Sequence, residues 1–262
     1  MLLWHLGMNE LEDKVAIITG GCGGIGTATV KAFLAAGARV MLVDLDGAKV
    51  EQTVKSLDSS RLKGFAADVS RADQVTSYVS ATISAFGGLD VLYANAGIEG
   101  LVRPLKDYPE AEFDRVLSVN VKGAFLGMKE CVPHLEKRGG GSIVVTASIA
   151  GLVGSPGMAA YISSKHAVIG LVKVAAIELG PLGIRVNAIA PGPVDNRMMR
   201  SLEEQSAPGK AETVKAGFTA QVPMGRYAKN EEIAQMALFL AGPRSSYSSG
   251  AVFLADGGFV AH

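Results

Sequence analysis

A tyrosine and a lysine separated by about one helical turn are well placed in this sequence to move a proton. Tyr161 and Lys165 are four residues apart in an apolar segment that predicts a helix, so their side chains would share one face. A free tyrosine has a pKa of about 10, and a nearby lysine cation is expected to lower that pKa by stabilising the phenolate. Ser148, which follows the preceding predicted strand, could hydrogen-bond the same substrate oxygen. In isolation, a tyrosine and a lysine at this spacing are more typical of an amphipathic helix surface.

A glycine-rich segment between a predicted strand and a predicted helix indicates a nucleotide site. Residues 19–26 read TGGCGGIG, and at such a position backbone N–H groups and the helix dipole favour a pyrophosphate. Glycine permits the tight turn and the close approach of the phosphate. Two registers fit the segment: one uses Gly21, Gly23 and Gly26, and the other uses Gly20, Gly24 and Gly26 behind Thr19.

An acidic residue at the end of the second predicted strand indicates which dinucleotide would bind. Asp44 stands there, where a carboxylate accepts hydrogen bonds from the adenosine ribose hydroxyls and repels a 2′-phosphate. Positions 22, 23 and 45 hold Cys, Gly and Leu, so none of them offers a cation to that phosphate. The expected cofactor is therefore NAD.

Short apolar segments alternate with longer helical patterns, and these elements must position the residues above. Strands are predicted at 15–19, 40–44, 65–68, 91–94, 142–147, 184–189 and 251–255, and helices at 25–36, 48–57, 75–86, 110–136, 159–179 and 231–240. This alternation predicts an α/β fold, a Rossmann-like, doubly wound parallel sheet with helices on both faces. We expect one domain over residues 1–262, with an N-terminal extension at 1–11. Residues 191–229, rich in Met, Gly and Pro, break the rhythm and are expected to form a substrate lid loop.

Composition fits a globular protein and argues against several other classes. Hydrophobic residues make up 48% of the chain, charged residues 19%, and the formal net charge is zero, so nothing indicates a nucleic-acid or membrane partner. Cys22 and Cys131 are the two cysteines, and the sequence has no CxxC pair or His cluster. We therefore expect no metal site and a cytoplasmic protein. The apolar segment 167–179 is interrupted by Lys173 and Glu178, which argues against a bilayer span.

Taken together, these motifs resemble the short-chain dehydrogenase/reductase family over residues 12 to about 258. The resemblance is carried in chain order by Thr19-Gly-x-x-x-Gly-x-Gly26, Asp68-Val69, Asn95-Ala96-Gly97, Asn120, Ser148, Tyr161-x-x-x-Lys165 and Pro191-Gly192. It implies that Tyr161 is the general acid/base and that Ser148 orients the substrate oxygen. It further implies that Lys165 tunes Tyr161 and binds the nicotinamide ribose, and that Asn120 holds a water linking Lys165 to solvent.

The resemblance also implies a set of cofactor contacts. Asp68 and Val69 would line the adenine site, residues 95–97 would pack beside the adenosine ribose, and residues 191–194 would border the nicotinamide. The complete expected set is Gly20, Cys22, Gly24, Ile25, Gly26, Asp44, Leu45, Asp68, Val69, Asn95, Ala96, Gly97, Tyr161, Lys165, Pro191, Gly192 and Val194. Two positions depart from the family pattern. Tyr93-Ala94 stand where many relatives have a second asparagine nearby, and Asp195-Asn196 follow Val194 where a threonine commonly contacts the cofactor amide, so Asn196 is not expected to be a ligand.

A mainly apolar set of residues is expected at the substrate. Its members are Ile98, Ser148, Val153, Ser155, Met158, Val194, Met198 and Met199, which is consistent with a hydrophobic ketone. The methionines could equally be ordinary lid packing. Arg197 and Arg200 could instead hold an anionic group.

The expected function is NAD(H)-dependent interconversion of a secondary alcohol and a ketone. One alternative is a 3-oxoacyl thioester reductase of fatty-acid synthesis, although relatives of that kind tend to favour NADP and to carry an arginine in the glycine loop. Another is a non-catalytic NAD-binding scaffold, which would have no need of the four proposed catalytic residues together. The family usually forms tetramers through its two longest helices and last strand, here 110–136, 159–179 and 251–255, so a homotetramer is expected.

Overall fold

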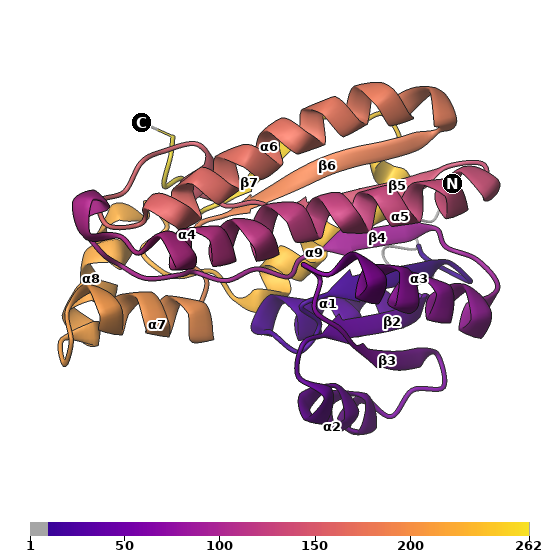
Figure 1. Cartoon of the computed structure of the whole chain (residues 1–262), viewed down its shortest axis with the longest axis horizontal. Coiled ribbons are helices and arrows are strands. Elements are labelled where there is room, and N and C mark those ends of the chain that lie inside the picture. Colours follow the sequence, from indigo (N-terminus) through magenta and orange to yellow (C-terminus); the bar gives the residue numbers. More distant parts are fainter. Residues whose placement is uncertain (1–9, 262) are drawn as a thin grey trace, which may run out of the picture.

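The computed structural model describes residues 10–261, and a seven-stranded parallel sheet runs through its centre (Figure 1). The strands are β1 Val15–Thr19, β2 Arg39–Asp44, β3 Leu62–Ala66, β4 Val91–Ala94, β5 Gly141–Thr146, β6 Ile184–Pro191 and β7 Val252–Ala255. Their order is β3-β2-β1-β4-β5-β6-β7, and every neighbouring pair is parallel. The order changes direction between β1 and β4, so the carboxyl ends of these two strands border a crevice of the kind in which open α/β sheets bind ligands.

Helices cover both faces of this sheet. The described helices are α1 Gly24–Ala35, α2 Gly47–Leu57, α3 Ala72–Phe86, α4 Glu110–Leu117, α5 Gly123–Lys137, α6 Ala159–Leu179, α7 Arg197–Ser206, α8 Ala211–Gln221 and α9 Asn230–Ala241. Successive side chains of a strand point to opposite faces, and β1 accordingly places Val15 and Ile17 in one core and Ala16 and Ile18 in the other. The predicted doubly wound fold is confirmed by the parallel strand order and by the two apolar cores on opposite faces of the sheet.

The predicted helix at 110–136 is a continuous helical stretch with one irregular turn. α4 passes through a π-helical segment, Ser118–Lys122, into α5. Such wide turns often occur at functional sites. This one carries Asn120, which is 3% exposed.

The long α6 presents one face to the protein interior. Its buried positions recur every three or four residues: Ala160, Tyr161, Ser164, Lys165, Val168, Ile169, Val172 and Ala175. Among the described helices, this one and its following turn (Ala159–Leu182) are long and apolar enough for a membrane span, but 44% of that apolar window is buried within the protein. The segment packs against β6 as a core helix.

The expected lid, residues 191–229, contains two helices where the sequence predicted a loop. α7 and α8 lie together at one end of the molecule (Figure 1). Asn196 caps α7, because its Oδ1 accepts a hydrogen bond from the Met198 N–H at 3.0 Å. The Met, Gly and Pro content of the segment predicted a loop. That content does not reveal where a capping residue such as Asn196 starts a helix.

The expected N-terminal extension is shorter in the structure than residues 1–11. Leu11 is 1% exposed, belongs to the core beside α1, and donates its N–H to the Ala36 carbonyl at 2.9 Å. Glu10 forms an ion pair with Arg244 at 2.9 Å. Leu11 is a single apolar residue among charged ones, so no periodic pattern in the sequence indicated that it is buried. Residues 1–9 of the predicted extension lie outside the described residues.

Candidate functional site

The proposed catalytic side chains meet inside the protein beside the carboxyl end of the sheet. Tyr161 and Lys165 come from the buried face of α6, and Ser148 lies two residues beyond β5. Their exposed fractions are 8%, 4% and 9%. The Lys165 Nζ lies 5.5 Å from the centre of the Tyr161 ring, and Ser148 is near enough to the Tyr161 hydroxyl to lower its pKa. The structure therefore brings together the three residues whose spacing suggested proton transfer.

Lys165 is held by the backbone of the neighbouring strand. Its Nζ donates a hydrogen bond to the Thr146 carbonyl at 2.7 Å. Burial lowers the pKa of Lys165 to about 8, because a charged ammonium is costly away from water. An ammonium has three donors, so two remain for other partners.

The pKa of Tyr161 moves opposite to the expected direction. Burial raises it to about 12, the negative charge of Glu99 acts in the same direction, and the hydrogen bond with Ser148 lowers it only in part. The hydroxyl also faces the Met198 sulfur at 3.8 Å, a weak acceptor. The expectation that Lys165 lowers the Tyr161 pKa is therefore not met in this structure, because the loss of water around the buried hydroxyl dominates its pKa.

Asn120 joins the loop after β4 to α6. Its Nδ2 donates to the Ile98 carbonyl at 3.0 Å and to the Ser164 hydroxyl at 2.9 Å, and its Oδ1 accepts from the Ile98 N–H at 2.8 Å. The side chain is thus engaged by protein groups. Its expected part in holding a water stays a prediction.

Steric contacts explain the glycines of the loop between β1 and α1. Gly20 has a φ of +64°, and a Cβ there would lie 2.9 Å from the Ala96 Cα. A Cβ at Gly26 would collide with the Gly20 carbonyl oxygen, and one at Gly24 would press on the Asn230 side chain, whereas one at Gly23 would meet nothing closer than 3.4 Å. A Cβ at Gly21 would also collide with the Leu42 side chain, so Gly23 is the one of these positions with room for a side chain. The register of Gly20, Gly24 and Gly26 is therefore the one in which every glycine is sterically required.

The start of α1 offers a place for an anion. The helix begins at Gly24, its N-cap is Gly23, and among the described residues no side chain caps it and its first turn has no acid. The first N–H groups of a helix lack partners within the helix and are suited to phosphate. The residues present therefore fit a dinucleotide pyrophosphate.

Asp44 ends β2 as expected and holds the glycine loop. Its Oδ2 accepts the Cys22 N–H at 2.9 Å, and its Oδ1 accepts the Leu45 N–H at 2.8 Å. Ionised carboxylates have about four acceptor positions, so Asp44 can bind further donors. Burial raises the pKa of the Cys22 thiol, so Cys22 contributes its backbone rather than a reactive sulfur.

Asn95 ties the end of β4 to the glycine loop. Its Nδ2 donates to the carbonyls of Thr19 (3.1 Å) and Gly20 (3.3 Å). The Thr19 hydroxyl in turn accepts the N–H groups of Asn95 and Ala96. Asn95 therefore stabilises the conformation of the glycine loop through its backbone carbonyls.

Thr146 is a site residue that sequence reasoning missed. Its Oγ1 lies 3.0 Å from the Asn95 Oδ1 and 2.8 Å from the hydroxyl oxygen of the buried Tyr93. An amide oxygen can only accept, so the single Thr146 hydroxyl proton goes to Asn95 and Tyr93 donates to Thr146. Because the Thr146 carbonyl also accepts a hydrogen bond from Lys165, this residue connects the glycine loop with the proposed catalytic lysine. The one signal in the sequence was the unusual Tyr93 before Asn95.

The other expected cofactor residues occupy ends of strands or the turns beyond them. Asp68 lies two residues past β3, which ends earlier than predicted, and its Oδ1 accepts the N–H and hydroxyl of Ser70 at 2.9 and 2.7 Å. Gly192 donates its N–H to the Ala255 carbonyl, and Val194, 3% exposed, forms a β-bridge with Ala228.

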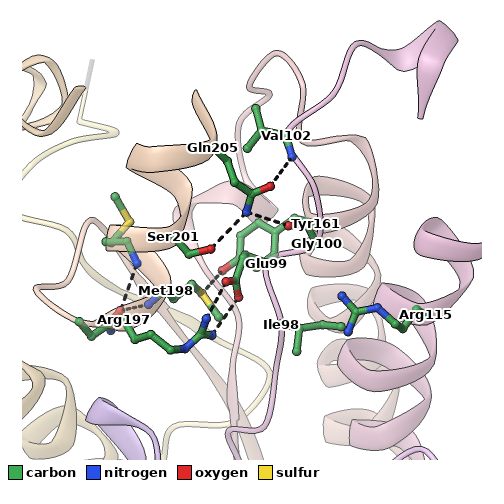
Figure 2. Close-up of polar contacts among 12 residues, drawn as sticks. Ile98, Glu99, Gly100, Val102, Arg115, Tyr161, Arg197, Met198, Ser201 and Gln205 are labelled. Atoms are coloured by element: carbon green, nitrogen blue, oxygen red, sulfur yellow. Dashed lines mark hydrogen bonds and ion pairs between the residues drawn. The ribbon is translucent and has the colours of Figure 1, made fainter. Parts of the chain in front are cut away.

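The lid arginines are paired with carboxylates of this chain. Arg197 contacts both oxygens of Glu99 at 2.8 and 3.1 Å (Figure 2). Arg200 forms ion pairs with the fully buried Glu203 at 2.9 Å and with Asp195 at 3.5 Å. Both arginine charges are thus paired with carboxylates of this chain, although the buried Nε and Nη2 of Arg200 donate no hydrogen bond to any described residue.

The expected substrate residues are distributed unevenly. Met198 reaches the Tyr161 hydroxyl, and Ile98 is fixed beside the site by Asn120. Val153 and Ser155 are exposed, and Met158 and Met199 are half-buried. No described contact joins these four to Tyr161, so their substrate role stays a prediction.

Comparisons with known proteins identify the family of the chain. A family model described as enoyl-(acyl carrier protein) reductase matches residues 20–260. The chain is 37% identical to levodione reductase of Leifsonia aquatica, covering 95% of each chain. It is also 38% identical to 2,5-dichloro-2,5-cyclohexadiene-1,4-diol dehydrogenase of Sphingobium indicum (97% of this chain, 100% of the relative) and 38% identical to 3-oxoacyl-[acyl-carrier-protein] reductase of Thermotoga maritima (96% and 99%).

The fold comparison points to the same family. The crystal structure of levodione reductase superposes with a TM-score of 0.92 at 36% identity, covering 95% of this chain and 98% of that one. The match extends over nearly the whole chain, and the span of the family model, residues 20–260, contains the positions of the candidate site from Gly20 onward. The chain belongs to the short-chain dehydrogenase/reductase family and, as these relatives indicate, is an oxidoreductase acting on CH–OH groups.

Proposed function

We propose that this enzyme interconverts a secondary alcohol and a ketone with NAD(H), using Tyr161 as the general acid/base. The observation that carries the proposal is the buried cluster of Tyr161, Ser148 and Lys165 next to the glycine loop. NAD(H), when bound, supplies or accepts the hydride. The protein has to move one proton at the substrate oxygen and keep that oxygen in place.

Tyr161 performs the proton step in both directions. In reduction its hydroxyl gives the proton to the developing alkoxide, and in oxidation the phenolate takes the proton from the alcohol. Ser148 hydrogen-bonds the same oxygen and fixes its position. Lys165 keeps two donors beyond its bond to Thr146, enough to hold ribose hydroxyls beside Tyr161.

The preference for NAD over NADP rests on Asp44. Its carboxylate anchors the Cys22 N–H and keeps acceptor capacity for ribose hydroxyls, while its negative charge opposes a 2′-phosphate. The described glycine-loop neighbours at 22, 23 and 45 supply no compensating cation.

We propose a hydrophobic, cyclic secondary alcohol or ketone as the substrate class. The apolar Met198 at the Tyr161 hydroxyl supports this proposal, as do relatives named for levodione and for a cyclohexadiene-diol. The 3-oxoacyl thioester alternative has a relative of equal identity. It is less favoured because Arg197 and Arg200 are already paired with carboxylates, leaving those lid cations engaged. A non-catalytic scaffold would not need the buried catalytic cluster.

We further propose a cytoplasmic homotetramer assembled through α5, α6 and β7. Large apolar side chains are exposed on all three elements: Phe125, Val174, Ile177 and Leu254. The two cysteines are unpaired, in keeping with a reducing compartment. The described residues contain no group of three or more His, Cys, Asp or Glu that could hold a metal.

Tyr161→Phe tests the mechanism, because it keeps the ring and removes the proton. Turnover of ketones, followed by NADH absorbance, should fall by at least ~10²–10⁴-fold. NADH binding, followed by fluorescence, should persist, since the glycine loop and Asp44 are untouched. A variant with near-normal turnover would rule out Tyr161 as the acid/base.

A further inference from the structure

One face of α7 is bound to the loop that follows β4. Arg197, Ser201 and Gln205 are spaced four residues apart and therefore share that face. Arg197 binds both oxygens of the Glu99 carboxylate, and the Ser201 hydroxyl accepts a hydrogen bond from the Gln205 Nε2 at 3.2 Å. Gln205 donates from Nε2 to the Gly100 carbonyl at 3.3 Å and accepts the N–H of residue 102 at 3.1 Å. Figure 2 shows how Arg197 and Gln205 of α7 reach this loop.

Glu99 is the fixed member of its ion pair. It is 7% exposed, whereas the Arg197 side chain is 72% exposed. A buried carboxylate without a partner is strongly unfavourable, and a bidentate arginine meets both of its oxygens. Moving α7 away from the loop after β4 would therefore leave the buried Glu99 carboxylate without its partner. Glu99 thus favours the position in which α7 packs against this loop, which we call the seated position.

Seating α7 has a direct consequence at the catalytic tyrosine. The residue after Arg197 is Met198, and its sulfur lies 3.8 Å from the Tyr161 hydroxyl (Figure 2). A substrate oxygen has to approach that hydroxyl to hydrogen-bonding distance before a proton can transfer. The Met198 side chain therefore has to move away from this hydroxyl when substrate binds, and a methionine side chain is flexible enough to do so.

We propose that Glu99 is a positioning residue that seats α7 through Arg197, and that the seated Met198 is displaced by substrate and limits the bulk accepted beside the reacting carbon. The part of this proposal that concerns substrate rests on the proposed function of Tyr161. The part that concerns α7 does not, and the two can be tested separately.

The seating of α7 can be measured without turnover by hydrogen–deuterium exchange. Arg197→Met removes the cation but leaves an apolar side chain on an exposed position, so the fold should survive. Exchange in peptides from residues 197–206 should be at least about tenfold faster, since charge-assisted hydrogen bonds are lost. Glu99→Gln should act in the same direction, and Arg197→Lys should restore slow exchange in part.

Arg71→Met is the matched control. Arg71 also forms an ion pair with a carboxylate, that of Asp73, and is 60% exposed on another part of the fold. Its replacement should leave α7 exchange unchanged. Unchanged exchange in α7 for both Arg197→Met and Glu99→Gln would overturn the positioning role, and faster exchange throughout the sheet would mean general destabilisation and would overturn it as well.

The role of Met198 is tested by kinetics on a series of cyclic ketones of increasing size. Met198→Ala should lower KM for the bulkier ketones by about threefold or more relative to small ones, with KM for NADH unchanged, whereas Met199→Ala should not. In the Arg197→Met background this advantage should disappear, because α7 no longer holds residue 198 over Tyr161. If Met198→Ala lowered KM for bulky ketones equally in the wild-type and Arg197→Met backgrounds, the position of α7 would not control the size of the substrate. Absence of ketone reduction in the unaltered protein would refute the proposed function and the substrate part, whereas the seating of α7 would still be decided by the exchange measurement.

Discussion

The buried ammonium of Lys165 has a measurable effect on stability, whose size follows from its surroundings. It is 4% exposed, and burial lowers its pKa from 10.5 to about 8. At about 1.4 kcal/mol per pKa unit, the folded state carries a penalty on the order of 3 kcal/mol when Lys165 is charged. Methionine has a similar volume and no charge, but it leaves the Thr146 carbonyl without its donor, which costs about 1–2 kcal/mol. Lys165→Met should therefore raise the free energy of unfolding by about 1–2 kcal/mol at pH 7.

The sign of the pH dependence follows from the two pKa values. Below about pH 8 both the folded and the unfolded states hold the proton, so the penalty is fully present. Between about pH 8 and 10.5 the Lys165 side chain holds its proton more in the unfolded state than in the folded state, so the penalty that it imposes on folding falls as pH rises. The advantage of Lys165→Met should therefore shrink between pH 7 and pH 9.5. Tyr161, whose pKa is raised from 10.0 to about 12, has the opposite effect and lowers stability as pH rises above about 10.

Thermal unfolding without added cofactor, followed by circular dichroism, measures the effect, because a bound ligand would add its own stabilisation. The variant should melt about 2–6 °C above the wild type at pH 7 and should be inactive. Lys173→Met, an exposed position on the same helix, is the matched control and should change little. The reasoning fails if Lys165→Met is no more stable than Lys173→Met, or if its advantage grows toward pH 9.5.

Three further outcomes are expected. Asp44→Ala should reduce the preference for NAD over NADP by at least about tenfold in kcat/KM, since a charge-assisted hydrogen bond and a repulsion are both lost; comparable use of both cofactors by the wild type would contradict the role given to Asp44. Thr146→Val keeps the shape of the side chain but removes the hydroxyl that hydrogen-bonds Asn95, so NADH should bind several-fold more weakly in a fluorescence titration. Thr146→Ser keeps the hydroxyl and should bind NADH almost normally. Equal NADH binding by the two variants would argue against the connection through Thr146. Light scattering at micromolar concentration should give the mass of four chains, and a stable monomer would exclude the proposed tetramer.

The sequence alone determined those features that are written locally or periodically. Alternating apolar strands and helices predicted the doubly wound sheet, because a strand covered on both faces must be apolar throughout. The four-residue spacing of Tyr161 and Lys165 fixed their common face on α6, and the glycine pattern marked the turn before α1. Asp44 could be placed because the carboxyl end of a strand adjoins that turn.

Features decided only by the tertiary structure depend on contacts between segments far apart in the chain. Glu99 and Arg197 are paired across 98 positions, and Thr146 meets Asn95 across 51, and no local pattern encodes either pairing. The helices of the lid were hidden for a related reason, since α7 is stabilised by its cap and by the loop after β4 rather than by composition. The pKa of Tyr161 was predicted in the wrong direction because spacing along a helix reveals a neighbouring charge, whereas the loss of water around a side chain depends on everything that packs over it.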